Sequence, residues 1–151
     1  MKSKDMQILA YLRNNARMPL TKMSKKTQIP VSTLFDRLKA SERSFILKHT
    51  SLLDFNRLGY HTRANITIKV NKDDKDGLKE FLTKHRSINS VFRITNGYDY
   101  MVEAIFKQIK DLEDFLEEMD GKFNIEKRQS YFIIEDIKKE GFMSDPDLIN
   151  L

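Results

Sequence analysis

The stretch of this sequence best suited to chemistry runs from Pro19 to Arg43, where hydroxyl and cationic side chains recur at helical spacing. Ser32 and Thr33 open its second half, and Arg37 follows one turn later. Hydroxyl groups can hydrogen-bond base edges or phosphates, and a guanidinium group can hold guanine through two hydrogen bonds. The chemistry indicated is therefore recognition of double-stranded DNA. The residues expected to contact it are Lys22, Lys25, Val31, Ser32, Thr33, Arg37, Lys39 and Arg43.

Two short helices separated by a turn near 28–30 are predicted to carry these side chains. Met23 and Thr27 in the first helix, and Leu34 and Leu38 in the second, turn inward at i, i+4 spacing. A short basic helix pair with a tight turn is the helix-turn-helix arrangement, whose second helix enters the DNA major groove. The alternative is a solvated helix face, on which the arginine of the second helix pairs with a neighbouring carboxylate and the lysines aid solubility.

Composition and charge agree with a DNA-binding first half. The chain has 151 residues, 40% hydrophobic and 32% charged, which indicates one or two globular domains. Residues 1–60 hold 12 Lys and Arg against 4 Asp and Glu, a net charge of +8, whereas residues 61–151 carry −3. The chain has no cysteine, which excludes disulfides and a cysteine nucleophile. Without a long apolar run or a signal peptide, a cytoplasmic location and no membrane partner are expected.

The N-terminal part is predicted to be a winged helix-turn-helix domain over residues 1–53. A helix over 5–15 precedes the helix pair, and extended segments over 45–47 and 49–53 are expected to form the wing. A linker is expected over 54–60, where Asn and Gly occur. The predicted core of this domain consists of Ile8, Leu9, Leu12, Met23, Ile29, Leu34, Leu38, Phe45 and Ile46.

Residues 61–142 are predicted to form a second, ferredoxin-like domain, which makes the fold class α+β. Strands are expected over 64–70, 91–95, 98–106 and 125–134, with helices over 73–85 and 109–119. This β-α-β-β-α-β order places two helices on one face of four antiparallel strands. Apolar groups on the other face, among Tyr98, Tyr100, Tyr131 and Phe132 or their neighbours, indicate a homo-oligomer, either a dimer or a dimer-based higher assembly. A loosely held polar tail is expected over 143–151.

Several motifs resemble those of the Lrp/AsnC family of feast/famine regulators. Residues 5–9, Asp-Met-Gln-Ile-Leu, look like the family's Asp-x-x-Ile-Leu opening, and Arg17 stands where the family has an arginine after the first helix. The pair at 37–38, Arg-Leu, resembles the Arg-Val pair of the recognition helix. Residues 95–100, TNGYDY, are similar to the family's Thr-Gly-x-Tyr-Asp hairpin, with the glycine one residue later. Gln28 replaces the usual glycine of the turn.

The resemblance implies a transcriptional regulator that binds DNA as a homo-oligomer and responds to a small molecule such as an amino acid. The implied effector site consists of Thr95, Asn96, Gly97, Tyr98 and Asp99. Turn amides can hold a carboxylate, and Asp99 can hold an ammonium group. The competing interpretation is that Asn-Gly alone makes a tight type I′ hairpin, and that Asp99 bonds backbone amides.

No catalytic residue, metal site or bound cofactor is predicted. His49, His61 and His85 are scattered and lack the spacing of metal ligands. The sequence has no nucleophile elbow and no glycine-rich phosphate loop. Two other functions stay open: an enzyme similar to the haem-pathway decarboxylases, which resemble this family in both domains, and an architectural protein that coats DNA with little sequence preference.

Overall fold

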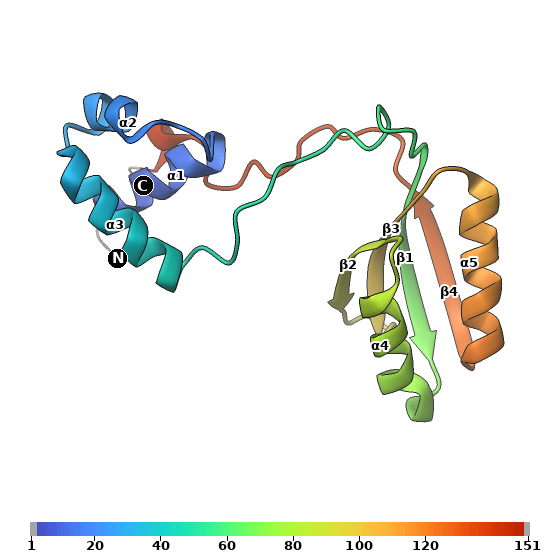
Figure 1. Cartoon of the computed structure of the whole chain (residues 1–151). Coiled ribbons are helices and arrows are strands. Elements are labelled where there is room, and N and C mark those ends of the chain that lie inside the picture. The colour runs from blue at the N-terminus through green and yellow to red at the C-terminus, as the bar shows by residue number, and fades with distance from the viewer. Residues whose placement is uncertain (1–2, 150–151) are drawn as a thin grey trace. The chain divides into compact units, whose positions relative to one another are not determined.

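The structure, a computed structural model, describes residues 3–149 and divides the chain into two compact units (Figure 1). The second unit is Leu53–Asp136, and the first combines Met1–Leu52 with Ile137–Leu151. The chain therefore passes between the units twice. Within residues 3–149, every helix is too short or too polar to span a bilayer.

The first unit is a three-helix domain around a small apolar core. Its helices are α1 (Ser3–Asn14), α2 (Leu20–Thr27) and α3 (Val31–Ser44), which confirms the predicted helix-turn-helix. Side chains from all three helices and the turn meet in this core at 3% exposure or less, because the i, i+4 spacing puts them on facing surfaces. The buried cluster consists of Ile8, Met23, Ile29 and Leu34, with Tyr11, Leu12, Met18 and Leu20 packed around it.

The turn between α2 and α3 is closed by Gln28 in a left-handed conformation, with φ 59° and ψ 28°. The Gln28 N–H donates to Ser24 O at 2.8 Å, and Ser24 Oγ donates to Ile29 O at 2.6 Å. A residue other than glycine reaches this region at a cost of about 1–2 kcal/mol. Gln28 therefore preserves the geometry of a glycine turn at some expense of stability.

The predicted wing is wrong, because the described chain has no strand between α3 and residue 62. At the end of α3, the N–H groups of Phe45 and Ile46 both donate to Ser41 O, at 2.8 and 3.0 Å. A strand needs a hydrogen-bonding neighbour, and residues 46–54 have no ladder partner. Phe45, expected in the core, is 55% exposed, and Leu47 is fully exposed.

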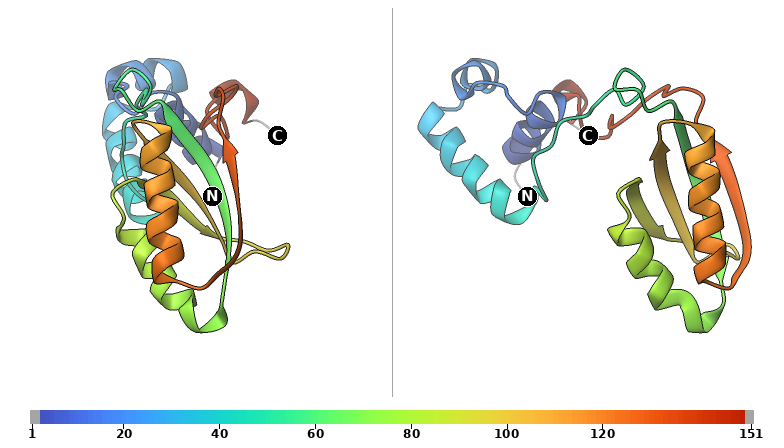
Figure 2. Two further views of the ribbon diagram at one scale, coloured as in Figure 1. Left: turned by 90° about the vertical axis from the view of Figure 1, so that its right-hand side faces the viewer. Right: turned by 45° about the vertical axis from the view of Figure 1, so that its right-hand side comes forward.

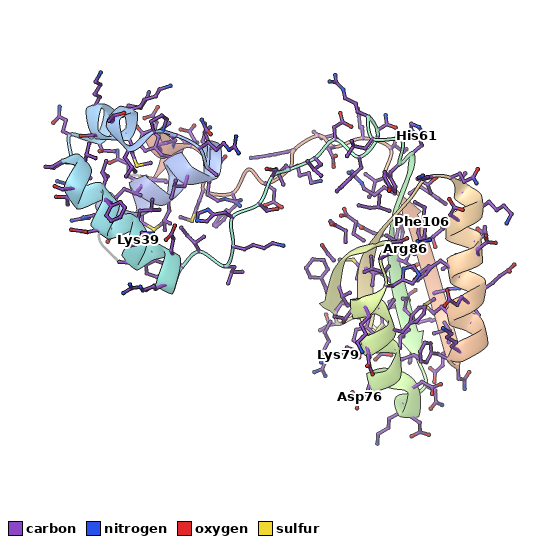
Figure 3. The ribbon with its side chains drawn as sticks, in the orientation of Figure 1. Lys39, His61, Asp76, Lys79, Arg86 and Phe106 are labelled. Atoms are coloured by element: carbon purple, nitrogen blue, oxygen red, sulfur yellow. The ribbon has the colours of Figure 1, made fainter. Side chains whose placement is uncertain are left out.

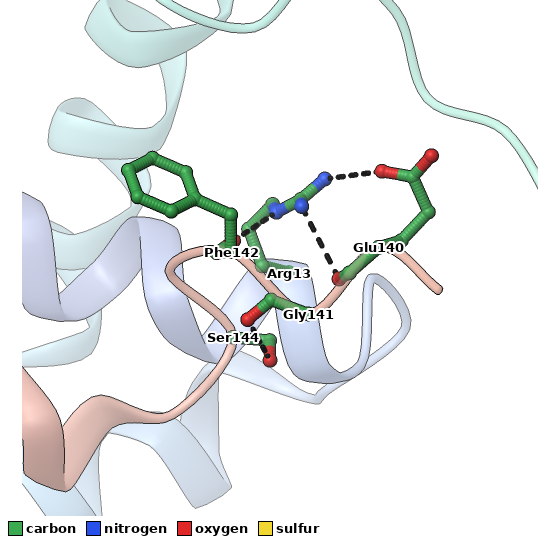
Figure 4. A network of polar contacts seen from close by, with 5 residues as sticks. All are labelled: Arg13, Glu140, Gly141, Phe142 and Ser144. Carbon is green, nitrogen blue, oxygen red and sulfur yellow. Dashed lines mark hydrogen bonds and ion pairs between the residues drawn. The ribbon is translucent and has the colours of Figure 1, made fainter. Parts of the chain in front are cut away.

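The segment after the last strand packs on α1. The tail is therefore held more tightly than the prediction of a loosely held polar tail implies. Arg13 holds it with three hydrogen bonds (Figure 4): Nε donates to Phe142 O at 3.0 Å, Nη2 to Glu140 O at 3.2 Å, and Nη1 to the Glu140 carboxylate at 3.2 Å. A short 3₁₀ helix, η2 (Pro146–Leu148), then lies beside α1. This part of the tail is a component of the helix-turn-helix unit.

The second unit is a four-stranded antiparallel sheet in the order β2-β3-β1-β4, with α4 and α5 on one face (Figure 2). This is the predicted ferredoxin-like arrangement. Alternate residues of β1, from Thr62 to Val70, are at most 5% exposed, because they face the helices. The elements are β1 (Thr62–Val70), η1 (Lys72–Asp74), α4 (Lys75–Lys84), β2 (Ile88–Arg93), β3 (Tyr100–Phe106), α5 (Ile109–Lys122) and β4 (Ile125–Phe132).

The sheet face away from the helices is mixed, and the prediction of an apolar face was partly wrong. Tyr100 pairs with Ile68, so both side chains point to the helices. Tyr100 is 7% exposed, and its hydroxyl donates to Lys75 O at 3.1 Å. The opposite face combines apolar and polar side chains. Following the strand registers, it carries Phe92, Met101, Ile105 and Tyr131 together with Arg63, Asn65, Thr67, Glu103 and Gln129.

Candidate functional site

The outer face of α3 presents four of the eight residues predicted to contact DNA. Leu34 is fully buried against the core, and this orientation turns the opposite side of α3 to solvent. Figure 3 shows Lys39 on this helix. The exposed predicted residues on α3 are Val31, Ser32, Lys39 and Arg43, and Lys22 and Lys25 are exposed on α2. Thr33 and Arg37 are only partly exposed.

Arg37 has a structural partner that the sequence did not indicate. Its Nη1 donates to Asp5 Oδ1 at 2.9 Å, and the two side chains are 25% and 23% exposed. The neighbouring carboxylate of Glu42 instead approaches Lys39 Nζ at 3.6 Å and His49 Nε2 at 3.2 Å. Arg37 therefore joins α1 to α3, and less of its guanidinium group is open to a base or phosphate.

The start of α3 is open to an anion. Pro30 occupies the N-cap position, and no side chain caps the helix. The first intrahelical bond runs from Leu34 N–H to Pro30 O at 3.0 Å. The amides of Val31, Ser32 and Thr33 precede this bond, and amides at a helix start suit a phosphate oxygen.

Phe35 is a residue of this face that the sequence reasoning missed. Its side chain is 50% exposed, whereas the adjacent Leu34 is fully buried. The Lys39 ammonium lies 5.5 Å from the centre of the phenyl ring. The available signal was its position, since Phe35 falls outside the inward stripe of Leu34 and Leu38.

The predicted effector loop is a twisted hairpin between β2 and β3. Asn96 has φ 69° and Gly97 has φ 84°, the positive values that a type I′ turn requires at both central positions. Arg93 pairs with Tyr100, the register that a two-residue turn sets. The strands end at these residues, earlier than predicted, and Thr95, Asn96 and Gly97 are exposed.

Asp99 already has partners within the chain. Its Oδ2 accepts from Val70 N–H at 3.0 Å, its Oδ1 lies 3.2 Å from Lys75 Nζ, and its own N–H donates to Ile68 O at 2.9 Å. Burial alone raises the pKa of Asp99, but the Val70 hydrogen bond and the Lys75 ammonium outweigh it and hold the pKa below the ordinary value. The carboxylate therefore ties the hairpin to the end of β1.

The fold also brings Lys127 of β4 to the hairpin, which the sequence did not indicate. Its ammonium lies 4.4 Å from the centre of the Tyr98 ring. A Cβ atom built on Gly97 would lie 3.5 Å from the same ammonium. The Tyr98 hydroxyl donates to Gln129 Oε1 at 3.2 Å, so the loop leans toward β4. An exposed turn beside an ammonium group is suited to a carboxylate.

A helix-turn-helix unit joined to a ferredoxin-like domain with an exposed loop defines a DNA-binding regulatory protein of two domains. Residues 63–142 match the Lrp/AsnC ligand binding domain, which is more than half of the chain. The chain belongs to the Lrp/AsnC family.

Relatives and solved structures agree with this assignment. The HTH-type transcriptional regulator FL11 of Pyrococcus horikoshii is 32% identical over 114 residues, which are 75% of this chain and 76% of FL11. An uncharacterized HTH-type transcriptional regulator of Pyrococcus furiosus is 27% identical over 94% of this chain and 96% of its own. The fold is similar to a transcriptional regulator of Neisseria meningitidis solved with L-Met, with TM-score 0.85, 22% identity and coverage of 92% and 93% of the two chains.

Proposed function

We propose that this protein is a sequence-specific, DNA-binding transcriptional regulator that acts as a homo-oligomer and is modulated by a small molecule such as an amino acid. The observation that carries the proposal is the outer face of α3. Ser32, Lys39 and Arg43 are exposed there, on a helix held by a buried core and preceded by a tight turn. The basic charge of residues 1–60 supports contact with a polyanion.

The test is selection of genomic DNA fragments by the purified full chain, followed by a salt titration on a selected site. Neutralising roughly six to ten phosphates predicts that affinity falls by about 10³ to 10⁵ between 50 and 200 mM salt. Footprinting of the selected fragments then separates two outcomes: discrete protected sites support the regulator, whereas uniform coating supports an architectural protein. Affinity that does not change with salt would remove DNA binding from the proposal.

Assembly is proposed to use the open face of the sheet, where a second copy would cover apolar side chains. Phe92 is 51% exposed and Tyr131 is 52% exposed. Light scattering should show a smaller assembly for Phe92→Asp than for the matched control Leu47→Asp. Equal masses for both variants would place the interface elsewhere.

The effector is proposed to bind at the hairpin, with its carboxylate near Lys127 and the exposed turn amides. The regulator of Neisseria meningitidis was solved with L-Met, which supports an amino acid as the first class of molecule to test. Asp99 is a less direct probe than Lys127, because its bonds to Val70 and Lys75 also stabilise the fold.

A thermal-shift screen against the common amino acids tests this proposal. Wild type should be stabilised by at least one amino acid, and Lys127→Gln should lose that shift. Lys79→Gln, an exposed lysine on α4 (Figure 3), is the matched control and should keep it. If Lys127→Gln responds as wild type does, the effector does not use this ammonium group.

A further inference from the structure

One aromatic ring on α3 lies outside the buried core of the first unit and is half exposed. Phe35 is 50% exposed and is absent from the buried cluster of that unit. Val31, one turn earlier, is 41% exposed, and Lys39, one turn later, places its ammonium 5.5 Å from the ring centre. Residues four apart lie on the same side of a helix. Val31, Phe35 and Lys39 therefore form a line along the solvent side of α3.

The charge around Phe35 favours a nucleic acid over an apolar protein surface as the molecule that covers the ring. Lys39 and Arg43 follow along the exposed side of α3, and the uncapped helix start precedes it. Asp36, beside Phe35, is also exposed. A carboxylate is unfavourable next to phosphates but can accept a hydrogen bond from the amino group of cytosine. Phe35 and Asp36 are therefore suited to base edges in the groove, and the cations of Lys39 and Arg43 are suited to the phosphate backbone.

A phenyl ring has no conventional hydrogen-bonding group, so the best match for it on a base edge is an apolar group. In the major groove, the C5-methyl group of thymine is the apolar feature that distinguishes the base pairs. Val31 and Phe35 are about 6 Å apart along the helix axis, which is less than two base-pair steps of roughly 3.4 Å each. Both side chains can therefore face bases within one half-site.

We propose that Phe35 is a specificity-determining residue that contacts a thymine methyl group in each half-site. The inference rests on the proposed DNA-binding function and names one base feature that it reads. Phe35 would distinguish thymine from cytosine at that position by contact with the methyl group. Because the methyl group is the feature recognised, 5-methylcytosine should be accepted better than cytosine.

The experiment uses the full chain and a duplex obtained by genomic selection. Each thymine is replaced in turn by deoxyuridine, which removes only the methyl group, and Kd is measured by fluorescence anisotropy at fixed salt. For wild type, one position in each half-site should lose about fourfold in affinity, the worth of one buried methyl group. Phe35→Ala, which removes the ring from both half-sites, should bind the unmodified duplex at least about sixteenfold more weakly. At the sensitive position, this variant should bind thymine and deoxyuridine equally.

Two controls keep the result specific. Phe45→Ala removes a similarly exposed phenyl ring, 55% exposed at the end of α3, and should keep the wild-type response to deoxyuridine. Phe35→Leu keeps an apolar side chain and should retain part of the preference for thymine. Thermal melting of each variant verifies that the unit remains folded.

The outcomes separate this inference from the proposed function. If wild type selects no DNA, the proposed function fails. If wild type binds a site but no thymine is sensitive, or if Phe35→Ala keeps the sensitivity, the methyl-reading role is wrong. A change in mass of Phe35→Ala by light scattering, with the deoxyuridine response intact, would instead assign the ring to a protein contact and overturn the inference.

Discussion

The ion pair between Arg37 and Asp5 makes a prediction that separates stability from DNA contact. The two groups join α3 to α1 at 2.9 Å, with about a quarter of each side chain exposed. Exposed pairs contribute about 0.2–1 kcal/mol, and removing one partner of a buried pair costs about 3–5 kcal/mol. At this intermediate burial, we expect either Asp5→Ala or Arg37→Ala to cost about 1–2 kcal/mol.

For a small unit, a loss of 1–2 kcal/mol corresponds to a fall in Tm of roughly 5–15 °C. The assay is thermal and urea unfolding of wild type, Asp5→Ala, Arg37→Ala and the double variant, followed by circular dichroism. Because the partners act together, the double variant should lose little more than either single variant. Arg43→Ala, an exposed cation on the same helix, is the control and should change the unfolding free energy by no more than about 0.5 kcal/mol.

DNA affinity measured below the melting temperature completes the test. Asp5→Ala removes no positive charge, so any loss of binding in this variant reports the position of α3. If Arg37 acts through that position, Asp5→Ala and Arg37→Ala should weaken binding to a similar degree. Unchanged stability of Asp5→Ala, together with a large loss of affinity for Arg37→Ala alone, would refute this reasoning and return Arg37 to direct DNA contact.

Three other outcomes are expected. Arg13→Ala should release the tail from α1, because the variant loses three hydrogen bonds to Phe142 and Glu140. Limited proteolysis should then cut the tail faster than in wild type, and an unchanged rate of digestion would contradict this expectation. Gln28→Gly should raise Tm by a few degrees, because glycine avoids about 1–2 kcal/mol of left-handed strain and loses part of that gain to chain entropy. Asp99→Asn should be less stable than wild type at neutral pH. Because the folded pKa of Asp99 is lowered, its contribution is present above the ordinary value of 3.8 and disappears as the pH falls through the folded pKa, so the two unfolding curves should converge in acid.

Local patterns were sufficient for most of the secondary structure. The i, i+4 spacing that begins at Met23 in α2 and at Leu34 in α3, and the alternation along β1, are properties of neighbouring residues. Both patterns predicted the observed elements. Asn96-Gly97 likewise defined the turn, since both residues adopt positive φ. The wing failed because a strand depends on a partner elsewhere in the chain, and a local apolar run does not indicate whether one exists.

The candidate sites depended more on contacts between distant residues. The exposure of Phe35 also had to be seen in the structure, because a phenylalanine is usually assigned to a core until the packing is known.

The sequence by itself determined the order of the main helices and of the four sheet strands, the division into two units and the basic helix that faces solvent, because these follow from periodicity and charge along the chain. Only the tertiary structure decided that Arg37 pairs with Asp5, that Arg13 holds the tail, and that Lys127 lies beside the Gly97 turn. The physical reason is that an ion pair or a hydrogen bond acts over a few ångströms in space. Residues 32 or 129 positions apart reach that distance only after the core has packed and the strands have taken their register.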